Sequence, residues 1–168
     1  IDVGCGTGLA GEEIKKNIQS NINLRGFDLS PRMVELASAR SLQDGVRVYS
    51  SVRQGDAAKL LAQEPAETVD IIVAADVFIY IGDVSSIFEA SCNCLKVGGV
   101  IVFSLETIAH GMRLLPSGRF GHSQDYIKER ARLFGLELVH WKDGVLRKQR
   151  GEDVQGATVI LQLRKSPT

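Results

Sequence analysis

The chain has 168 residues and a mass of 18.3 kDa, which is enough for one well-buried α/β core and too little for two comfortable domains. Its 20 basic and 20 acidic residues cancel, so no chain-wide field attracts nucleic acid or an anionic membrane surface, and we expect neither partner. No run of about 18 apolar residues, as a membrane-spanning helix needs, occurs. Cys5, Cys92 and Cys94 lack the spacing of a disulfide framework or a metal site, so we expect no bound metal and a reducing, cytoplasmic location.

A glycine-rich turn stands at the start of the chain. Gly4, Gly6 and Gly8 directly follow the segment 1–3, which is typical of the end of a strand. Without Cβ atoms, this turn can adopt positive φ angles and let a ligand contact its N–H groups. A helix is predicted from Leu9 to about residue 20. A strand, a glycine turn and a helix N-terminus in this order indicate a nucleotide-like ligand.

The rest of the chain alternates between strand and helix patterns. The expected strands are 24–29, 46–52, 69–75, 100–105, 136–141 and 158–163, and the expected helices are 30–40, 58–61, 83–95 and 123–134. This alternation predicts a parallel sheet with helices on both faces. The last two strands are joined by about fifteen residues without a helical pattern, so we expect them to pair antiparallel. The predicted fold is a Rossmann-like three-layer α/β sandwich with a mostly parallel seven-stranded sheet and one antiparallel strand near the C-terminus.

Acidic residues stand at the carboxyl ends of three of these strands, at Asp28, Asp56 and Asp76. In an open parallel sheet, ligands bind beyond the carboxyl ends of the strands, near the point where strand order reverses. Asp28 lies twenty residues after Gly8, where an acid can accept both hydroxyls of a ribose. Helix capping is the alternative for Asp28 and Asp56, although Ser30 is a better cap for the helix after Asp28.

Two overlapping glycine patterns compete at the turn. Residues 6–11 match the G-x-G-x-x-G pattern that binds a dinucleotide, which would make the protein an NAD-dependent oxidoreductase. That frame leaves Gly4 unexplained, whereas the frame that starts at Gly4 has Leu9 in the third glycine position. The earlier frame also explains Asp2, because a carboxylate there would repel a pyrophosphate but attract an ammonium group.

Several segments in the right order resemble the motifs of class I S-adenosylmethionine-dependent methyltransferases. The first four motifs correspond to residues 2–8, 26–33, 55–57 and 74–81, and residues 95–99 are similar to the segment before the fifth strand. The resemblance covers most of residues 1–106. It implies S-adenosylmethionine as the cofactor.

The resemblance also implies a role for each position in these motifs. The turn 4–8 would hold the methionine portion, with Asp2 near its amino group. Asp28 would bind the ribose, and Asp76 would begin the loop that faces the sulfonium and the methyl acceptor. The implied cofactor-binding residues are Asp2, Gly4, Cys5, Gly6, Gly8, Asp28, Leu29, Asp56, Ala57 and Asp76, of which Leu29, Asp56 and Ala57 would contact the adenine.

The function that the resemblance implies is transfer of a methyl group from S-adenosylmethionine to a small-molecule or protein acceptor. Such a transfer is an in-line displacement, so alignment of acceptor, methyl group and sulfur supplies much of the acceleration. A general base is needed only if the acceptor must lose a proton. Candidates near the expected face are Tyr80, Glu106, His110, His122 and Tyr126.

The second half of the chain is similar to a branch of these enzymes that often carries tetratricopeptide repeats upstream. The similarity rests on residues 118–123, Tyr126, 145–147 and Gly156. Arg119 and Arg147 have the planar fork that suits a substrate carboxylate. We nevertheless expect both to be solvated surface charges, and the basic cluster of Arg147, Lys148 and Arg150 to lie in a solvent-exposed loop.

The chain does not begin with Met and opens on a strand of a parallel sheet. We therefore expect residues 1–168 to form a single methyltransferase domain that lacks its N-terminal segment. This expectation gives weight to a second interpretation, a non-catalytic domain that binds S-adenosylmethionine or S-adenosylhomocysteine as a sensor or scaffold. The NAD-dependent oxidoreductase is the third.

Overall fold

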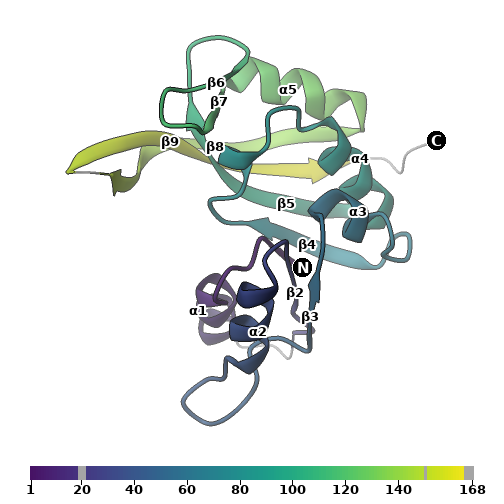
Figure 1. The fold of residues 1–168 in the computed structure, drawn as a ribbon. Coiled ribbons are helices and arrows are strands. Elements are labelled where there is room, and N and C mark those ends of the chain that lie inside the picture. Colours follow the sequence, from purple (N-terminus) through teal and green to yellow (C-terminus); the bar gives the residue numbers. More distant parts are fainter. Residues whose placement is uncertain (19–21, 150, 165–168) are drawn as a thin grey trace.

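One mixed sheet with helices on both faces forms the protein (Figure 1). The computed structural model describes residues 1–18, 22–149 and 151–164. The first half contains β1 (Asp2–Val3), α1 (Leu9–Asn17), β2 (Arg25–Asp28), α2 (Pro31–Ala39), β3 (Ser51–Gln54) and α3 (Ala57–Leu61). The second half contains β4 (Val69–Ala74), the 3-10 helix η1 (Phe78–Tyr80), α4 (Ser85–Cys94), β5 (Leu95–Thr107), β6 (Met112–Leu114), β7 (Phe120–His122), α5 (Gln124–Leu133), β8 (Leu136–Gln149) and β9 (Glu152–Leu163). None of the described helices is long and apolar enough to cross a membrane.

The strand order confirms the predicted fold. Strands β3, β2, β1, β4 and β5 lie side by side in this order and are all parallel, β9 then pairs antiparallel with β5, and β8 pairs antiparallel with β9. All seven expected strands are present in the sheet. Because the order reverses between β1 and β4, a ligand crevice is expected at the carboxyl ends of these two strands.

Two further short strands add to the predicted seven. Strands β6 and β7 form a hairpin, and β7 pairs parallel with the end of β5 through Glu106↔Gly121 and Thr107↔His122. The pairing of β4 with β5 stops at Phe103, so β7 occupies the edge of β5 beyond the point where β4 has ended. Strands of three residues are too short for a readable alternation of apolar and polar residues, so the sequence did not indicate them.

The final hairpin is longer than predicted. Its ladder runs from Leu136↔Leu163 to Gln149↔Glu152, so much of the stretch 142–157, which the sequence indicated as a loop, is paired strand. Polar residues on both faces of this hairpin hide the two-residue period of a strand. The predicted basic loop is therefore wrong at Arg147 and Lys148, which lie on β8, while Arg150 lies outside the described residues.

Two predicted elements have different bounds in the structure. The third strand begins later than expected, at Ser51, and the apolar residues Val48 and Tyr49 are buried before it instead of within it. The first helix ends at Asn17, and residues 19 and 20, where the prediction ended it, lie outside the described residues.

Two groups of buried side chains fill the two sides of the sheet. The larger group packs with α3, α4 and α5 and includes the stacked rings of Phe78 and Phe103, whose centroids are 4.0 Å apart. The smaller group packs with α1 and α2, which Figure 1 shows together and apart from the other helices. It consists of Cys5, Leu24, Ala37, Val48 and Tyr49.

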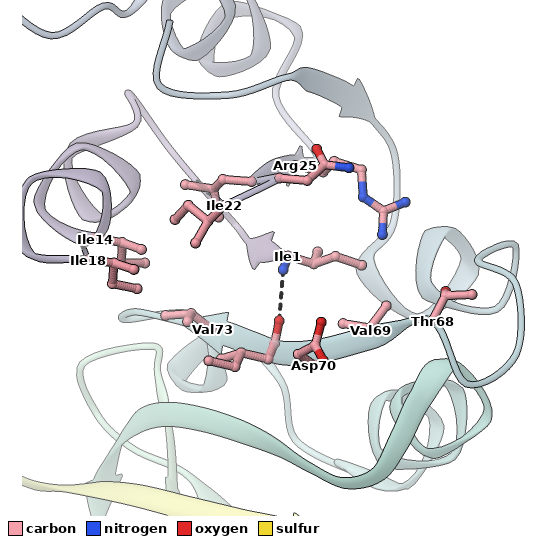
Figure 2. Close-up of a pocket in the computed structure, with 12 residues that line it drawn as sticks. Ile1, Ile14, Ile18, Ile22, Arg25, Thr68, Val69, Asp70 and Val73 are labelled. Atoms are coloured by element: carbon pink, nitrogen blue, oxygen red, sulfur yellow. Dashed lines mark hydrogen bonds between the residues drawn. The ribbon is translucent and has the colours of Figure 1, made fainter. Parts of the chain in front are cut away.

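A pocket of about 380 Å³ opens at the amino ends of β1, β2 and β4 (Figure 2). Ile14 and Ile18 line one side of it, and Val69 and Val73 line the other. Ligands of parallel α/β sheets bind at the carboxyl ends of the strands, so this pocket lies at the edge opposite to the expected cofactor site.

Candidate functional site

The glycine turn leads from the carboxyl end of β1 into α1. Gly4, Gly6 and Gly8 have φ angles of 63°, 53° and 86°, in the left-handed region that favours glycine. A Cβ on Gly6 would meet nothing within 4 Å, so the turn is open on that side. A Cβ on Gly4 would lie 2.4 Å from a methyl group of Val77, so the loop after β4 packs directly on the turn.

Asp28, at the end of β2, holds the turn in place. Its Oδ2 accepts a hydrogen bond from the Gly6 N–H at 2.8 Å, and its Oδ1 accepts one from the Ser30 N–H at 2.8 Å. The expectation that Ser30 caps α2 is confirmed, because its hydroxyl accepts from the Met33 N–H at 3.4 Å. Each carboxylate oxygen keeps a lone pair for a ligand hydroxyl. The neighbouring Leu29 is 72% exposed and offers an apolar surface of the kind an adenine ring packs on.

Asp2 is buried directly before the turn and is only partly satisfied. Its Oδ2 accepts a hydrogen bond from the Tyr49 hydroxyl at 2.6 Å, while its Oδ1 has no hydrogen-bond partner among the described residues. Burial raises the pKa of Asp2 from 3.8 to about 6, and the bond from Tyr49 opposes that rise. A buried carboxylate oxygen without a donor destabilises the fold, and a cationic group such as an ammonium would satisfy it.

The other residues expected to bind the cofactor are either partly buried or already used in contacts within the fold. Asp56 caps α3, because its Oδ1 accepts from the Lys59 N–H at 3.0 Å, so the capping alternative is confirmed for this residue. Ala57 is the half-buried first residue of that helix. Cys5 is buried, and burial raises the pKa of its thiol to about 12, so this side chain contributes packing and not reactivity.

Asp76 begins the loop after β4 with a strained backbone. Its φ of 56° is uncommon for a residue other than glycine. The Asp76 N–H donates to the Ser104 hydroxyl at 2.9 Å, and its Oδ1 accepts from Arg147 Nη1 at 2.6 Å. Arg147 Nη2 also donates to Glu106. The start of this loop is thus fixed to both β5 and β8.

Arg119 and Arg147 are not the solvated surface charges that the sequence suggested. Their side chains are only 23% and 20% exposed. Arg119 donates to Gln149, and its Nη1 lies 3.9 Å from the Glu106 carboxylate. Arg147 and Asp76 are 71 residues apart in the chain, so no local pattern could have paired them.

Three of the candidate general bases differ widely in exposure. Tyr80 is 66% exposed in η1, and His110 is exposed in the turn after β5. Glu106 is 6% exposed and is held by Arg147. Only Tyr80 and His110 of these three are open to solvent.

The other two candidates hold the loop after β4 against α5. His122 is fully buried, and its Nε2 lies 3.0 Å from the Gly82 carbonyl oxygen, so this nitrogen carries the proton. Burial lowers the pKa of His122. The Tyr126 hydroxyl donates to Asp83 at 3.3 Å. The suggested capping role of His122 is wrong, because the Ser123 hydroxyl accepts the capping bond from the Tyr126 N–H at 3.2 Å.

Comparison with known proteins identifies the family. Residues 1–103 match the family model described as a methyltransferase domain. A ubiquinone biosynthesis O-methyltransferase of Xanthomonas axonopodis pv. citri (strain 306) is 30% identical over 153 residues, which are 84% of this chain and 59% of that protein. The chain thus spans less than two thirds of this relative's length.

Two solved structures share the fold. A SAM-dependent methyltransferase of Methanosarcina mazei has a TM-score of 0.75 and 17% identity, and the match covers 96% of this chain and 90% of that one. The [4+2]-cyclase SpnF has a TM-score of 0.75 and 20% identity, and the match covers 96% of this chain and 73% of that one.

The family match includes β1 and the glycine turn and ends within β5, so it spans the half of the sheet that carries the first four motifs. It favours the frame that starts at Gly4 over the dinucleotide frame 6–11. Gly11, the last glycine of the dinucleotide frame, has a packing role, because a Cβ there would lie 2.2 Å from the Tyr49 hydroxyl oxygen. The chain belongs to the methyltransferase domain family, in the class I fold whose cofactor is S-adenosylmethionine.

Proposed function

We propose that this domain transfers the methyl group of S-adenosylmethionine to a small-molecule or protein acceptor. The contact between Gly4 of the turn and Val77 of the loop after β4 carries the proposal. Methyl transfer requires donor and acceptor to be aligned in one place, and this contact joins the predicted donor segment to the predicted acceptor segment. The Xanthomonas relative is named an O-methyltransferase, so an oxygen atom is the first acceptor to test.

In this proposal, the residues around the turn bind and orient the cofactor. The unsatisfied Oδ1 of Asp2 fits the amino group, Asp28 fits the ribose hydroxyls, and the exposed Leu29 fits the adenine. Asp56 and Ala57 follow Gly55, whose N–H donates to the Asp28 carbonyl oxygen at 3.0 Å, so they border the same region from the start of α3. When bound, S-adenosylmethionine supplies a methyl group that its sulfonium already activates, so the chain's own task is alignment.

The proposal assigns no general base. Glu106 is bound by Arg147, and His122 is buried with its Nε2–H bonded to Gly82. Both side chains are therefore occupied by partners within the fold, and Tyr80 and His110 are the candidates that are open to solvent.

Ligand-induced thermal stabilisation tests the cofactor assignment. S-adenosylmethionine and S-adenosylhomocysteine should each raise the melting temperature, because a ligand at about 100 times its Kd adds about 2.7 kcal/mol to the free energy of unfolding. NAD should have no effect. A response to NAD alone would overturn the proposal.

Binding and transfer must be tested separately, because the cyclase SpnF shares the fold and its name states another activity. A radiolabelled methyl group should pass from S-adenosylmethionine to a compound in a metabolite or protein extract. Tight binding with no labelled product in any fraction would instead favour the sensor or scaffold.

Replacement of Asp28 by Asn tests the ribose assignment. The Asn side chain can still accept from one backbone N–H but has no negative charge, so the affinity for S-adenosylhomocysteine should fall by about 10- to 100-fold. Asp44→Asn is the matched control, since Asp44 is exposed and accepts a hydrogen bond from the Val46 N–H within its own loop. Unchanged affinity in Asp28→Asn, measured by calorimetry, would show that the ribose assignment is wrong.

We also propose that residues 1–168 fold as one domain in a reducing compartment such as the cytoplasm. Both groups of buried side chains pack on a single sheet, which supports one domain. Cys5, Cys92 and Cys94 are free and buried, which is the usual state of cysteines in a reducing environment. Limited proteolysis should therefore leave one core fragment with three titratable thiols after unfolding.

A further inference from the structure

Two arginines and two carboxylates meet at the carboxyl ends of β4 and β5. Arg147 donates to Asp76 at 2.6 Å and to Glu106, and Arg119 Nη1 lies 3.9 Å from the same Glu106 oxygen. The Glu106 side chain is 8% exposed, whereas that of Asp76 is 49% exposed. Glu106 is therefore a fixed counter-ion, and Asp76 is the partner that a ligand could replace at little cost in desolvation.

Both arginines have N–H groups that donate no hydrogen bond to an acceptor in the described part of the chain. Arg147 Nε is buried without a hydrogen-bond partner there. Arg119 uses Nη1 for Gln149 and Glu106. A buried donor without an acceptor costs about 1–3 kcal/mol, so an added acceptor at this position would be favourable. The planar fork of a guanidinium group matches a carboxylate with two parallel hydrogen bonds.

The cluster lies where the methyl acceptor is expected. Asp76 is the residue before Val77, which packs on Gly4 of the glycine turn. Tyr80, four residues after Asp76, is 66% exposed and offers an aromatic surface on the same loop. A ligand held by Arg119 and Arg147 would therefore lie between the turn, this loop and the hairpin of β6 and β7.

We propose that Arg119 and Arg147 recognise a carboxylate group on the methyl acceptor, which replaces the Asp76 carboxylate on Arg147. The inference rests on the proposed methyl transfer. The two arginines and Glu106 sum to one positive charge, which Asp76 neutralises in the free protein. When Asp76, which is 49% exposed, turns into solvent, one ligand carboxylate restores this balance, whereas a doubly charged phosphate adds an uncompensated negative charge.

The test measures binding of small probes to the full chain saturated with S-adenosylhomocysteine. Benzoate carries the carboxylate on an aromatic ring, benzamide is its neutral isostere, and phenyl phosphate is the doubly charged alternative. Benzoate should bind at least about tenfold more tightly than benzamide, because a charge-assisted bidentate contact is lost in the amide. Phenyl phosphate that binds more tightly than benzoate would overturn the carboxylate assignment.

Two variants and a control locate the site. Arg119→Gln leaves Glu106 paired with Arg147, so the protein should fold, and benzoate affinity should fall about tenfold. Asp76→Asn removes the competing carboxylate, so benzoate affinity should rise by about threefold to tenfold. Arg113→Gln on the exposed strand β6 should change nothing. If Asp76 has only a structural role, Asp76→Asn will bind benzoate no better than the wild type, and that result would overturn the proposal.

The same titrations separate this inference from the proposed function. Normal binding of S-adenosylhomocysteine with no preference for benzoate over benzamide overturns the carboxylate site alone. Loss of S-adenosylhomocysteine binding with the benzoate preference retained overturns the proposed methyl transfer and leaves an anion site.

Discussion

Asp2 is a residue whose position lowers the stability of the fold. It is 1% exposed, and one of its oxygens has no hydrogen-bond partner in the described part of the chain. Burial raises its pKa to about 6, so the folded protein holds this carboxyl's proton more tightly than the unfolded chain does. An acid in such a position destabilises the free protein at neutral pH, which is expected of a group that serves a ligand.

Replacement of Asp2 by Asn should make the protein more stable at neutral pH. Between about pH 4 and pH 6 the unfolded chain binds fewer protons than the native state, so the wild-type free energy of unfolding falls as pH rises. Above pH 6 the full cost, about 3 kcal/mol, remains. The Asn variant should therefore gain up to about 3 kcal/mol at pH 8 and almost nothing at pH 4. Urea denaturation at both pH values measures the difference.

The same variant should bind S-adenosylhomocysteine more weakly, since the amide cannot neutralise an ammonium group. Asp44→Asn again serves as the control and should leave the pH profile unchanged. Equal stabilities of the Asp2→Asn variant and the wild type at pH 8 would contradict the assigned pKa shift.

For single residues, the sequence predicted the features that depend on neighbours in the chain. The turn 4–8, Asp28 at its spacing and the Ser30 cap all depend on neighbours within the motif, and the structure places each as expected. The bond from Tyr49 to Asp2 joins residues 47 apart, and only the folded sheet brings them together.

Among the elements, the hairpin of β8 and β9 has the least expected role. A bulge between Val145 and Arg147 interrupts its ladder, and such bulges redirect side chains. Arg147 reaches from β8 to Glu106 on β5 and to Asp76 after β4. The hairpin therefore carries part of the candidate acceptor site on an element that the sequence indicated as a loop.

A double-mutant cycle tests this contact between elements. Arg147→Met leaves the nearly buried Glu106 without its main counter-ion, so the free energy of unfolding should fall by about 3 kcal/mol. The double variant Glu106→Gln/Arg147→Met removes the unpaired charge and should recover most of that loss. Denaturant titration of the wild type, of Glu106→Gln, of Arg147→Met and of the double variant completes the cycle.

Lys148→Met is the matched control on the same strand. The Lys148 side chain is 75% exposed and pairs with Asp153 at 3.4 Å, so its loss should change stability by less than about 0.5 kcal/mol. If Lys148→Met and Arg147→Met destabilise equally, the ion pairs of Arg147 do not anchor the hairpin.

In the whole molecule, the two sides of the sheet have unequal cores. The group beneath α3, α4 and α5 contains many large side chains, including Phe78, Phe88 and Phe103, whereas the group beneath α1 and α2 has five buried residues among those that the structure describes. The glycine turn and Asp2 belong to the side with the smaller core. The half that would bind the cofactor under the proposed function is thus the half with less buried apolar surface to stabilise it.

Hydrogen exchange should report this imbalance. Amides of α1 and α2 should exchange faster than those of α4 and β5 in the free protein, because local opening is easier where fewer apolar contacts are buried. S-adenosylhomocysteine should slow exchange in α1, α2 and β2 most, since it binds only the closed form. Uniform protection across the sheet in the free protein would contradict the unequal cores.

The order of strands and helices could be predicted because each strand and each helix has its own spacing of apolar residues in the sequence. The 69–75 and 100–105 strands, which are nearly all apolar, are found as β4 and β5. The β6 and β7 hairpin could not be predicted, because its pairing depends on β5 extending beyond the end of β4.

The extension of β5 beyond β4 separates the β6 and β7 hairpin from the other parallel strands. Strand β7 joins the sheet through only two residue pairs, Glu106↔Gly121 and Thr107↔His122, and neither pair involves β1, β2 or β4. His122 of β7 also bonds the Gly82 carbonyl oxygen in the loop after β4, so a replacement hairpin that keeps this histidine should leave the strand order β3, β2, β1, β4 unchanged. Because Arg119 lies in this hairpin, such a graft should change which carboxylate-bearing molecules the domain binds under the inference above, while β1, β2 and the glycine turn stay in place.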